Sequence, residues 1–167
     1  MSLTWVFLMN LSVVGNCKNL NHDEVEEVMN FYVGFLIPGS LKRKINLTVI
    51  FDDDLLETQD AYGLILSQMN TDSSFTIIIK IYPRLSKRKI LINMAHECIH
   101  IEHFVTGRFD VDGSGYYWDG EPLSWTDDTA YDTPDEIDAR SREKGLYEHW
   151  KSYKMGLSRF CDTSQTN

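Results

Sequence analysis

The sequence INMAHECIHIEHF, residues 92–104, places three histidines and two glutamates inside an otherwise apolar run. It belongs to a segment, residues 87–106, that follows a potential N-cap at Ser86 and precedes a potential C-cap at Gly107, so the pattern predicts a helix. Apolar side chains cover most of the circumference of this helix, which is typical of a buried one. Because buried His and Glu side chains are costly unless they are paired or bound to a metal, we expect the fold to be organised around this helix.

The remaining sequence predicts an α+β fold. Segments rich in β-branched and aromatic residues predict four strands, at residues 4–14, 45–51, 61–67 and 75–82. Capping and turn residues predict two further helices, at residues 22–37 and 134–154, and a long loop at residues 108–132. This order predicts a small, mostly antiparallel sheet packed on the buried helix, with a second long helix near the C-terminus.

Length and composition predict a single domain. The chain has 167 residues, of which 43% are hydrophobic, and no linker or repeat divides it. We expect the domain to span residues 1–156, followed by a polar tail at residues 157–167. Cys17, Cys98 and Cys161 are odd in number and widely spaced, which argues against a disulfide framework and favours the cytoplasm. The apolar N-terminal residues lack the basic start of a signal peptide and are too few to span a membrane.

Acidic residues are concentrated in one part of the chain. The net charge is −9, and residues 110–143 contain eleven Asp and Glu against two Arg, a net charge of −9 for that segment alone. Such a charge argues against nucleic acid and anionic membranes as partners and is compatible with a bound cation. For most of these residues, an acidic surface that confers solubility is the simpler explanation.

His96, Glu97 and His100 form an HExxH motif. Residues i and i+4 of a helix lie on one face, so both imidazoles can reach one metal ion. Glu97 is displaced by about 100° around the helix from His96, which keeps it off the metal but close enough to act as a general base toward a water. The motif is a signature of zinc hydrolases. The alternative is that these side chains form a cluster in the core in which their polar groups pair with one another and no metal is bound.

A third protein ligand must come from elsewhere. His103 shares the face of His96, but seven residues of helix rise by about 10.5 Å, too far for both to bind one ion. The last predicted helix offers Glu136 and Asp138, which lie about 200° apart around its axis, so only one of them can face the site. Glu136 could instead form a capping box with Thr133, and helix geometry alone does not choose between a ligand and a cap.

Residues 110–121 match an EF-hand calcium loop in part. Asp110, Asp112, Ser114, Gly115 and Glu121 occupy positions 1, 3, 5, 6 and 12 of such a loop. The residues that follow do not predict the second helix of an EF-hand. A Ca²⁺ site here is therefore an alternative hypothesis, either in place of the zinc site or beside it as a structural clamp.

Three segments resemble the small HExxH metallopeptidases of tailed bacteriophages: HECIHIEHFVTGRFD from residue 96, YYWDGEP from residue 116 and YDTPDEIDARSREKGLYEHW from residue 131. More distantly, the chain is similar to the SprT-like and ImmA/IrrE groups of the gluzincin-type zincins. The resemblance covers residues 45–150 and implies a zincin-like fold, a bound zinc ion and peptidase activity.

The resemblance also implies roles for single residues. In that family the third ligand is the glutamate three residues before an Ala, which is Glu136 before Ala139 in this chain. The family's aromatic residue after Pro is replaced by Asp135, and its glutamate directly before Ala is replaced by Asp138. The strand before the metal-binding helix, residues 75–82, is implied to bind substrate in extended form.

Together these features predict a zinc-dependent hydrolase, a metallopeptidase acting on peptide or protein substrates. We expect it in the cytoplasm, which is the host cytoplasm if a phage encodes it. His96, His100 and Glu136 are the predicted zinc ligands and Glu97 is the predicted general base. A zinc-stabilised binding or regulatory module without catalysis is the alternative function.

Stabilisation of the oxyanion requires a hydrogen-bond donor besides the metal. Tyr131 is the predicted donor. Tyr116, Tyr117 and Arg140 are the alternatives in the same part of the chain.

Overall fold

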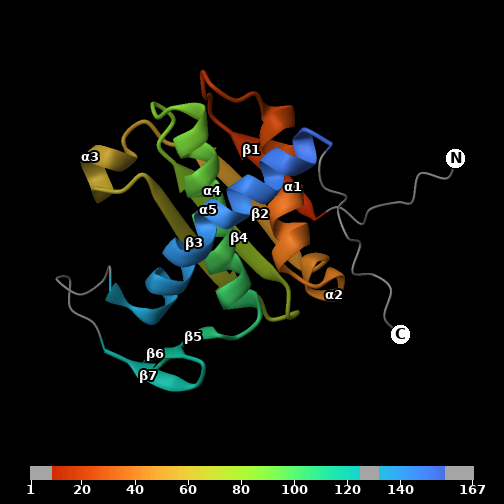
Figure 1. Cartoon of the computed structure of the whole chain (residues 1–167). Coiled ribbons are helices and arrows are strands. Elements are labelled where there is room, and N and C mark those ends of the chain that lie inside the picture. The colour runs from red at the N-terminus through yellow and green to blue at the C-terminus, as the bar shows by residue number, and fades with distance from the viewer. Residues whose placement is uncertain (1–8, 125–131, 157–167) are drawn as a thin grey trace, which may run out of the picture.

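The computed structural model describes residues 9–124 and 132–156 and has an α+β fold (Figure 1). The main sheet consists of β1 (Asn10–Val14), β2 (Ile45–Phe51), β3 (Gly63–Met69) and β4 (Phe75–Ile81). The helices are α1 (His22–Leu36), α2 (Gly39–Lys42), α3 (Leu55–Gln59), α4 (Lys87–Val105) and α5 (Pro134–Lys154). A second, small sheet consists of β5 (Phe109–Asp112), β6 (Gly115–Trp118) and β7 (Glu121–Leu123).

The main sheet is mixed, with the strand order β1-β2-β4-β3. β1, β2 and β4 run parallel to one another, whereas β3, at the edge, runs antiparallel to β4. The prediction of a mostly antiparallel sheet is therefore wrong. Instead, α1 crosses between β1 and β2, and β3 turns back on the outside of β4, which leaves β4 to pair with β2.

One face of the main sheet forms the core. The alternate residues of the two central strands that point to this face are buried: Ile45, Leu47, Val49 and Phe51 on β2, and Phe75, Ile77, Ile79 and Ile81 on β4. α4 packs on β3 and β4, α1 packs on β1 and α4, and α5 packs on α4 from the outside (Figure 1). α4 is thus enclosed between the sheet and α5, which explains why apolar residues surround it.

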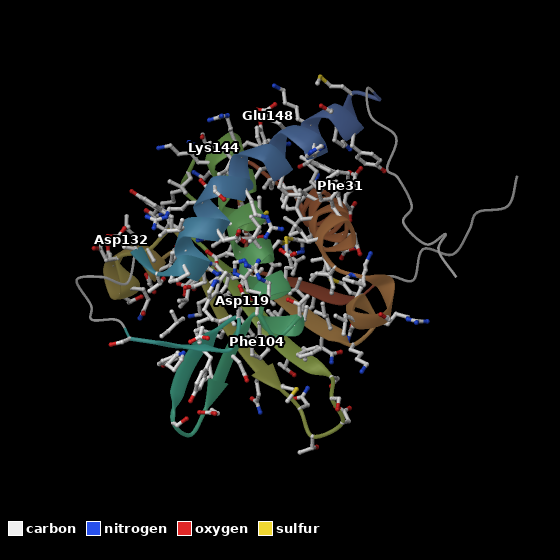
Figure 2. The ribbon with its side chains drawn as sticks, turned by 60° about the horizontal axis from the view of Figure 1, so that its bottom comes forward. Phe31, Phe104, Asp119, Asp132, Lys144 and Glu148 are labelled. Carbon is white, nitrogen blue, oxygen red and sulfur yellow. The ribbon has the colours of Figure 1, made fainter. Side chains whose placement is uncertain are left out.

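The small sheet corrects the predicted loop at residues 108–132, because residues 109–123 of that segment form three antiparallel strands. A tight turn joins the first two strands, and Asp112 stabilises it by accepting hydrogen bonds from the backbone N–H groups of Ser114 and Gly115. Figure 2 shows the small sheet near the C-terminal end of α4, with Asp119 and Phe104 labelled. The sheet therefore lies close to the polar residues of α4.

The other predicted elements are largely confirmed. The predicted helices at residues 22–37, 87–106 and 134–154 correspond to α1, α4 and α5, with ends that differ by no more than one residue. Of the predicted strand at residues 4–14, residues 10–14 form β1, and residues 4–8 lie outside the described part of the chain. The short helices α2 and α3 were not predicted. Among the described residues, no helix has both the length and the apolar composition needed to cross a membrane.

Candidate metal centre

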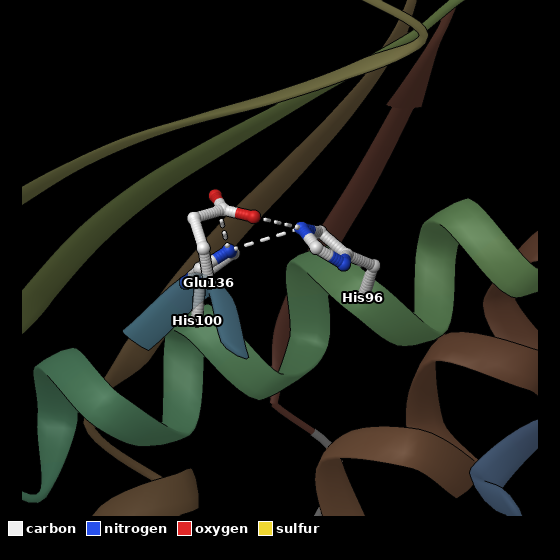
Figure 3. A group of neighbouring side chains, drawn as sticks. All are labelled: His96, His100 and Glu136. Atoms are coloured by element: carbon white, nitrogen blue, oxygen red, sulfur yellow. Dashed lines mark hydrogen bonds and ion pairs between the residues drawn. The ribbon is translucent and has the colours of Figure 1, made fainter. Parts of the chain in front are cut away.

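α4 and α5 bring the three predicted ligands together (Figure 3). His96 and His100 lie one turn apart on α4, and their Nε2 atoms are 3.1 Å apart. Glu136, in the first turn of α5, places Oε2 3.4 Å from His96 Nε2 and Oε1 3.2 Å from His100 Nε2. Among the described residues, these three form the one group of His, Cys, Asp or Glu side chains that converges closely enough to hold a metal ion.

The two imidazoles and the Glu136 carboxylate lie close enough to contact one metal ion. The Nε2 atoms of the imidazoles are 3.1 Å apart, and each of them lies 3.2 or 3.4 Å from a different oxygen of that carboxylate. One donor atom from each residue lies within 4.8 Å of the other two. Two imidazoles and one carboxylate are also a donor set found in catalytic zinc sites, where a fourth position is kept for water or substrate. The residues present therefore fit a zinc ion.

Two further carboxylates lie behind the histidines. Glu143 Oε2 lies 2.9 Å from His96 Nδ1, and Asp135 Oδ2 lies 3.9 Å from His100 Nδ1. A hydrogen bond from Nδ1–H to a carboxylate fixes the ring and leaves the lone pair of Nε2 for a metal. Neither role was predicted from the sequence. Glu143 could have been found, because it follows Glu136 by seven residues and so shares its face of α5.

The carboxylates control the proton affinity of this site. Burial by itself lowers the pKa of His96, but Glu136, Glu97 and Glu143 outweigh burial and raise the pKa to about 9. Burial likewise favours a higher pKa for Glu136, but its hydrogen bonds with His100 and His96 and their charges hold that pKa well below its usual range. The site therefore favours a cation, either a proton or a metal ion that displaces it.

Glu97 lies beside the three ligands and not among them. Its side chain is buried and lies against Gly63 of β3. Burial raises the pKa of Glu97, and the nearby His96 and His100 act in the opposite direction. A carboxyl group with a raised pKa next to a metal site can accept a proton and later return it, which is the chemistry predicted for Glu97.

A cleft of about 680 Å³ opens over the three ligands. β3 lines one side of the cleft through residues 63–65 and Ser67, and α4 and α5 line the other. β3 is an edge strand, so within the described residues one side of its backbone has no strand partner. The strand implied to bind substrate, residues 75–82, is β4, which pairs with β2 on one side and β3 on the other. It has no free edge for a peptide, so the implied role does not fit β4.

The two ends of the cleft differ in chemistry. Gly63 at the start of β3 lies against Glu97, whereas Met69 at its end pairs with Phe75, which packs on Phe104 near the end of α4. β3 and α4 therefore run in the same direction along the cleft. The end of the cleft near the C-terminus of α4 is lined by the apolar side chains of Ile65, Phe104 and Phe109, and the opposite end by Asp60 and Asn93.

His103 and Asp138 form a separate polar cluster. His103 is fully buried, and its Nε2 lies 2.7 Å from Asp138 Oδ2, to which Arg142 also donates a hydrogen bond at 2.8 Å. The ring of Trp118 on the small sheet meets the His103 ring at a centroid distance of 4.8 Å. Burial lowers the pKa of His103 to about 4, so its ring is neutral near pH 7. The geometry thus directs Asp138 away from the three ligands and leaves Glu136 as the carboxylate between the histidines.

The predicted oxyanion donors are placed differently from one another. Tyr131 lies outside the described residues. Tyr116 and Tyr117 lie on β6 and do not line the cleft. Arg140 lines the cleft, and its Nε donates a hydrogen bond of 3.2 Å to the backbone oxygen of Glu136.

The predicted calcium ligands are not brought together. Asp110 and Glu121 lie on different strands of the small sheet, and the Asp112 carboxylate accepts hydrogen bonds from the Ser114 hydroxyl and N–H. The segment is a sheet and not a loop between two helices. Within residues 9–124 and 132–156, no converging group of three potential metal ligands includes these residues.

Comparisons with protein-family models, curated proteins and solved structures found no match to this chain. The class of protein is therefore inferred from the geometry of the site.

Proposed function

We propose that the protein is a zinc-dependent hydrolase and, more narrowly, a metallopeptidase of zincin type. The observation that carries this proposal is the convergence of His96, His100 and Glu136, with side-chain N and O atoms 3.1–3.4 Å apart and buried Glu97 beside them in a cleft. A purely structural zinc site has four protein ligands, whereas three converge among the described residues. This donor set supports a catalytic role over a zinc-stabilised binding module.

A zinc ion held by these ligands would supply a Lewis acid, which polarises the scissile carbonyl group and lowers the pKa of water. Glu97 takes the proton from the attacking water and then delivers it to the leaving nitrogen. The raised pKa that burial gives Glu97 helps it to hold the proton between the two steps. Glu143 keeps the His96 imidazole oriented through a 2.9 Å hydrogen bond, and the Asp135 carboxylate lies 3.9 Å from the His100 ring as a nearby negative charge. Of the predicted oxyanion donors that the structure describes, we propose Arg140, because it lines the cleft.

The free edge of β3 supports a peptide as substrate. An extended peptide can add to an edge strand through backbone hydrogen bonds, and side-chain pockets then provide specificity. β3 lines the cleft from Gly63 to Ser67, so a peptide paired with it passes over the three ligands. In chain order, the antiparallel edge strand β3 is followed by β4 and then by α4, which carries the HExxH motif.

The test of this function is the variant Glu97→Gln. We expect it to bind one zinc per chain, because Glu97 is not a ligand, and to lose nearly all hydrolysis of fluorescein-labelled casein, because an amide cannot accept the proton. Glu148→Gln, on the exposed side of α5, serves as a control that keeps both properties. Metal content is measured by mass spectrometry and hydrolysis by the release of labelled peptides.

Two results would contradict the proposal. Full casein hydrolysis by Glu97→Gln would show that another group activates water. A wild-type protein that holds zinc tightly but cleaves neither casein nor a mixture of quenched-fluorescence peptides would support the non-catalytic module instead.

A further inference from the structure

Gly63, at the start of β3, lies directly against the Glu97 carboxyl group. A Cβ atom at position 63 would overlap Glu97 Oε1 and would lie 3.1 Å from Cδ and 3.4 Å from Cγ. The first contact is closer than any real Cβ tolerates, and the second is tighter than ordinary packing. Position 63 therefore has no room for any side chain while Glu97 keeps its place.

Space, and not backbone conformation, is the reason for a glycine here. The φ angle of Gly63 lies outside the left-handed region, so any residue could adopt this backbone. The strand cannot move back either, because Gly63 pairs with Ile81 of β4 and the adjacent Tyr82 N–H donates a 3.0 Å hydrogen bond to the Tyr62 oxygen. Only 5% of Glu97 is exposed, and its side chain borders the cleft, so the cleft is the direction in which a displaced carboxyl group can move.

We propose that Gly63 is a positioning residue for Glu97: the bare backbone at the start of β3 is the surface that sets where the carboxyl group lies. A methyl group at this position forces the carboxyl group away from β3, toward the cleft that Glu97 lines. The contact itself is independent of catalysis, and its consequence for turnover rests on the function proposed above.

A stability cycle tests the contact without any substrate. The four proteins are the wild type, Gly63→Ala, Glu97→Ala and the double variant, compared by melting temperature in the presence of zinc. Gly63→Ala is expected to lower the melting temperature of the wild type by about 5 °C, the effect of overpacking in a chain of this size. The same change in the Glu97→Ala background is expected to cost little, because the clashing atoms are gone.

Gly145→Ala is the matched control for this cycle. A Cβ at position 145, inside α5, meets nothing within 4 Å, so this variant should melt at or above the wild-type temperature. An equal loss from Gly63→Ala in both backgrounds would overturn the proposal. If Gly63→Ala does not fold alone, recovery of a cooperative transition in the double variant supports the contact, and failure of both variants overturns it.

Turnover tests the consequence. Gly63→Ala should keep zinc at wild-type stoichiometry, while kcat on fluorescein-casein falls by about 100-fold or more and KM changes little. Gly145→Ala should keep wild-type kcat. A Gly63→Ala protein with wild-type kcat would overturn the positioning role even if the stability cycle shows the contact. If the wild type itself hydrolyses nothing, the proposed function fails, and the stability cycle still decides the contact between Gly63 and Glu97.

Discussion

Replacing Glu143 with Ala is expected to weaken zinc binding while the fold is kept. Glu143 Oε2 accepts a 2.9 Å hydrogen bond from His96 Nδ1, and the two side chains are only 17% and 16% exposed. The carboxylate fixes the imidazole ring and makes Nε2 more basic. The loss of such a partner costs about 10–100-fold in metal affinity, which corresponds to about 1.4–2.8 kcal/mol. A loss toward the upper end is expected here, because little water can replace the carboxylate.

A second variant separates the two contributions. Glu143→Gln retains an oxygen that accepts the hydrogen bond from Nδ1–H but removes the negative charge, so its loss in affinity should be about tenfold and smaller than that of Glu143→Ala. The assay is a Zn²⁺ titration of metal-free protein in competition with a chromophoric chelator. Glu148→Ala is the matched control, because Glu148 lies exposed on the same helix and its carboxylate is near Lys151.

Zinc binding by Glu143→Ala that is as tight as that of the wild type would contradict the predicted role of Glu143. That result would mean that packing of α4 alone orients His96. A control variant with the same loss as Glu143→Ala would refute it equally, since the effect would then come from the net charge of α5. Melting temperatures of the metal-free proteins show whether either variant has simply unfolded.

Three further predictions concern other parts of the site. Asp138→Ala should keep one zinc per chain but lower the free energy of unfolding by about 1–3 kcal/mol, because buried His103 loses its hydrogen-bond partner. Urea unfolding measures the stability and metal analysis measures the zinc content. Loss of zinc from this variant would show that Asp138 is a ligand. Zinc binding near pH 7 should release about one proton, because the pKa of His96 is raised to about 9 and zinc requires the neutral ring. The release should vanish above that pKa, and calorimetry that shows no dependence on buffer ionisation enthalpy would contradict it. Phe109 lines the apolar end of the cleft. Phe109→Ser should therefore raise KM for peptides with large apolar residues more than KM for peptides with polar residues. An equal change in KM for the two kinds of peptide would exclude an apolar subsite.

The helix that carries the site could be predicted because its signals are local. The Ser86 side chain accepts a hydrogen bond from the Lys89 N–H, as a cap should, and the apolar residues that follow continue to the end of α4. The spacing of His96 and His100 is a property of any helix, so their convergence needed no knowledge of the fold. The axial rise that excluded His103 from the site is equally general, and the structure places His103 against Asp138 instead.

The parts of the site that the sheet contributes could not be predicted in the same way, because they depend on which strands become neighbours in the sheet. The position of β3 at the edge follows from the pairing of β2 with β4, and these two strands are separated in sequence by α3 and β3. No local sequence pattern predicts that β2 pairs with β4. The contact of Gly63 with Glu97 and the free backbone edge beside the cleft both follow from it. The sequence therefore predicted which residues of the two helices converge, but not the strand that lies opposite them.

Glu136 shows how tertiary contacts decide between two local roles. In α1, Asn21 and Glu24 form a complete capping box: the Asn21 side chain accepts from the Glu24 N–H, and the Glu24 carboxylate accepts from the Asn21 N–H. Thr133 and Glu136 have the same spacing at the start of α5, but the Thr133 side chain accepts no capping hydrogen bond from the described first turn.

The Glu136 carboxylate instead points to His96 and His100 across the interface with α4. A capping interaction is worth about 1 kcal/mol, whereas a zinc ligand contributes a share of a binding free energy of about 10–16 kcal/mol. A helix start that forgoes its cap is thus stable once its glutamate binds a metal. Pro at the first helical position and two acidic residues in the first turn offset part of the loss without the metal. The contacts with α4, and not the local capping pattern, therefore decide where the Glu136 carboxylate lies.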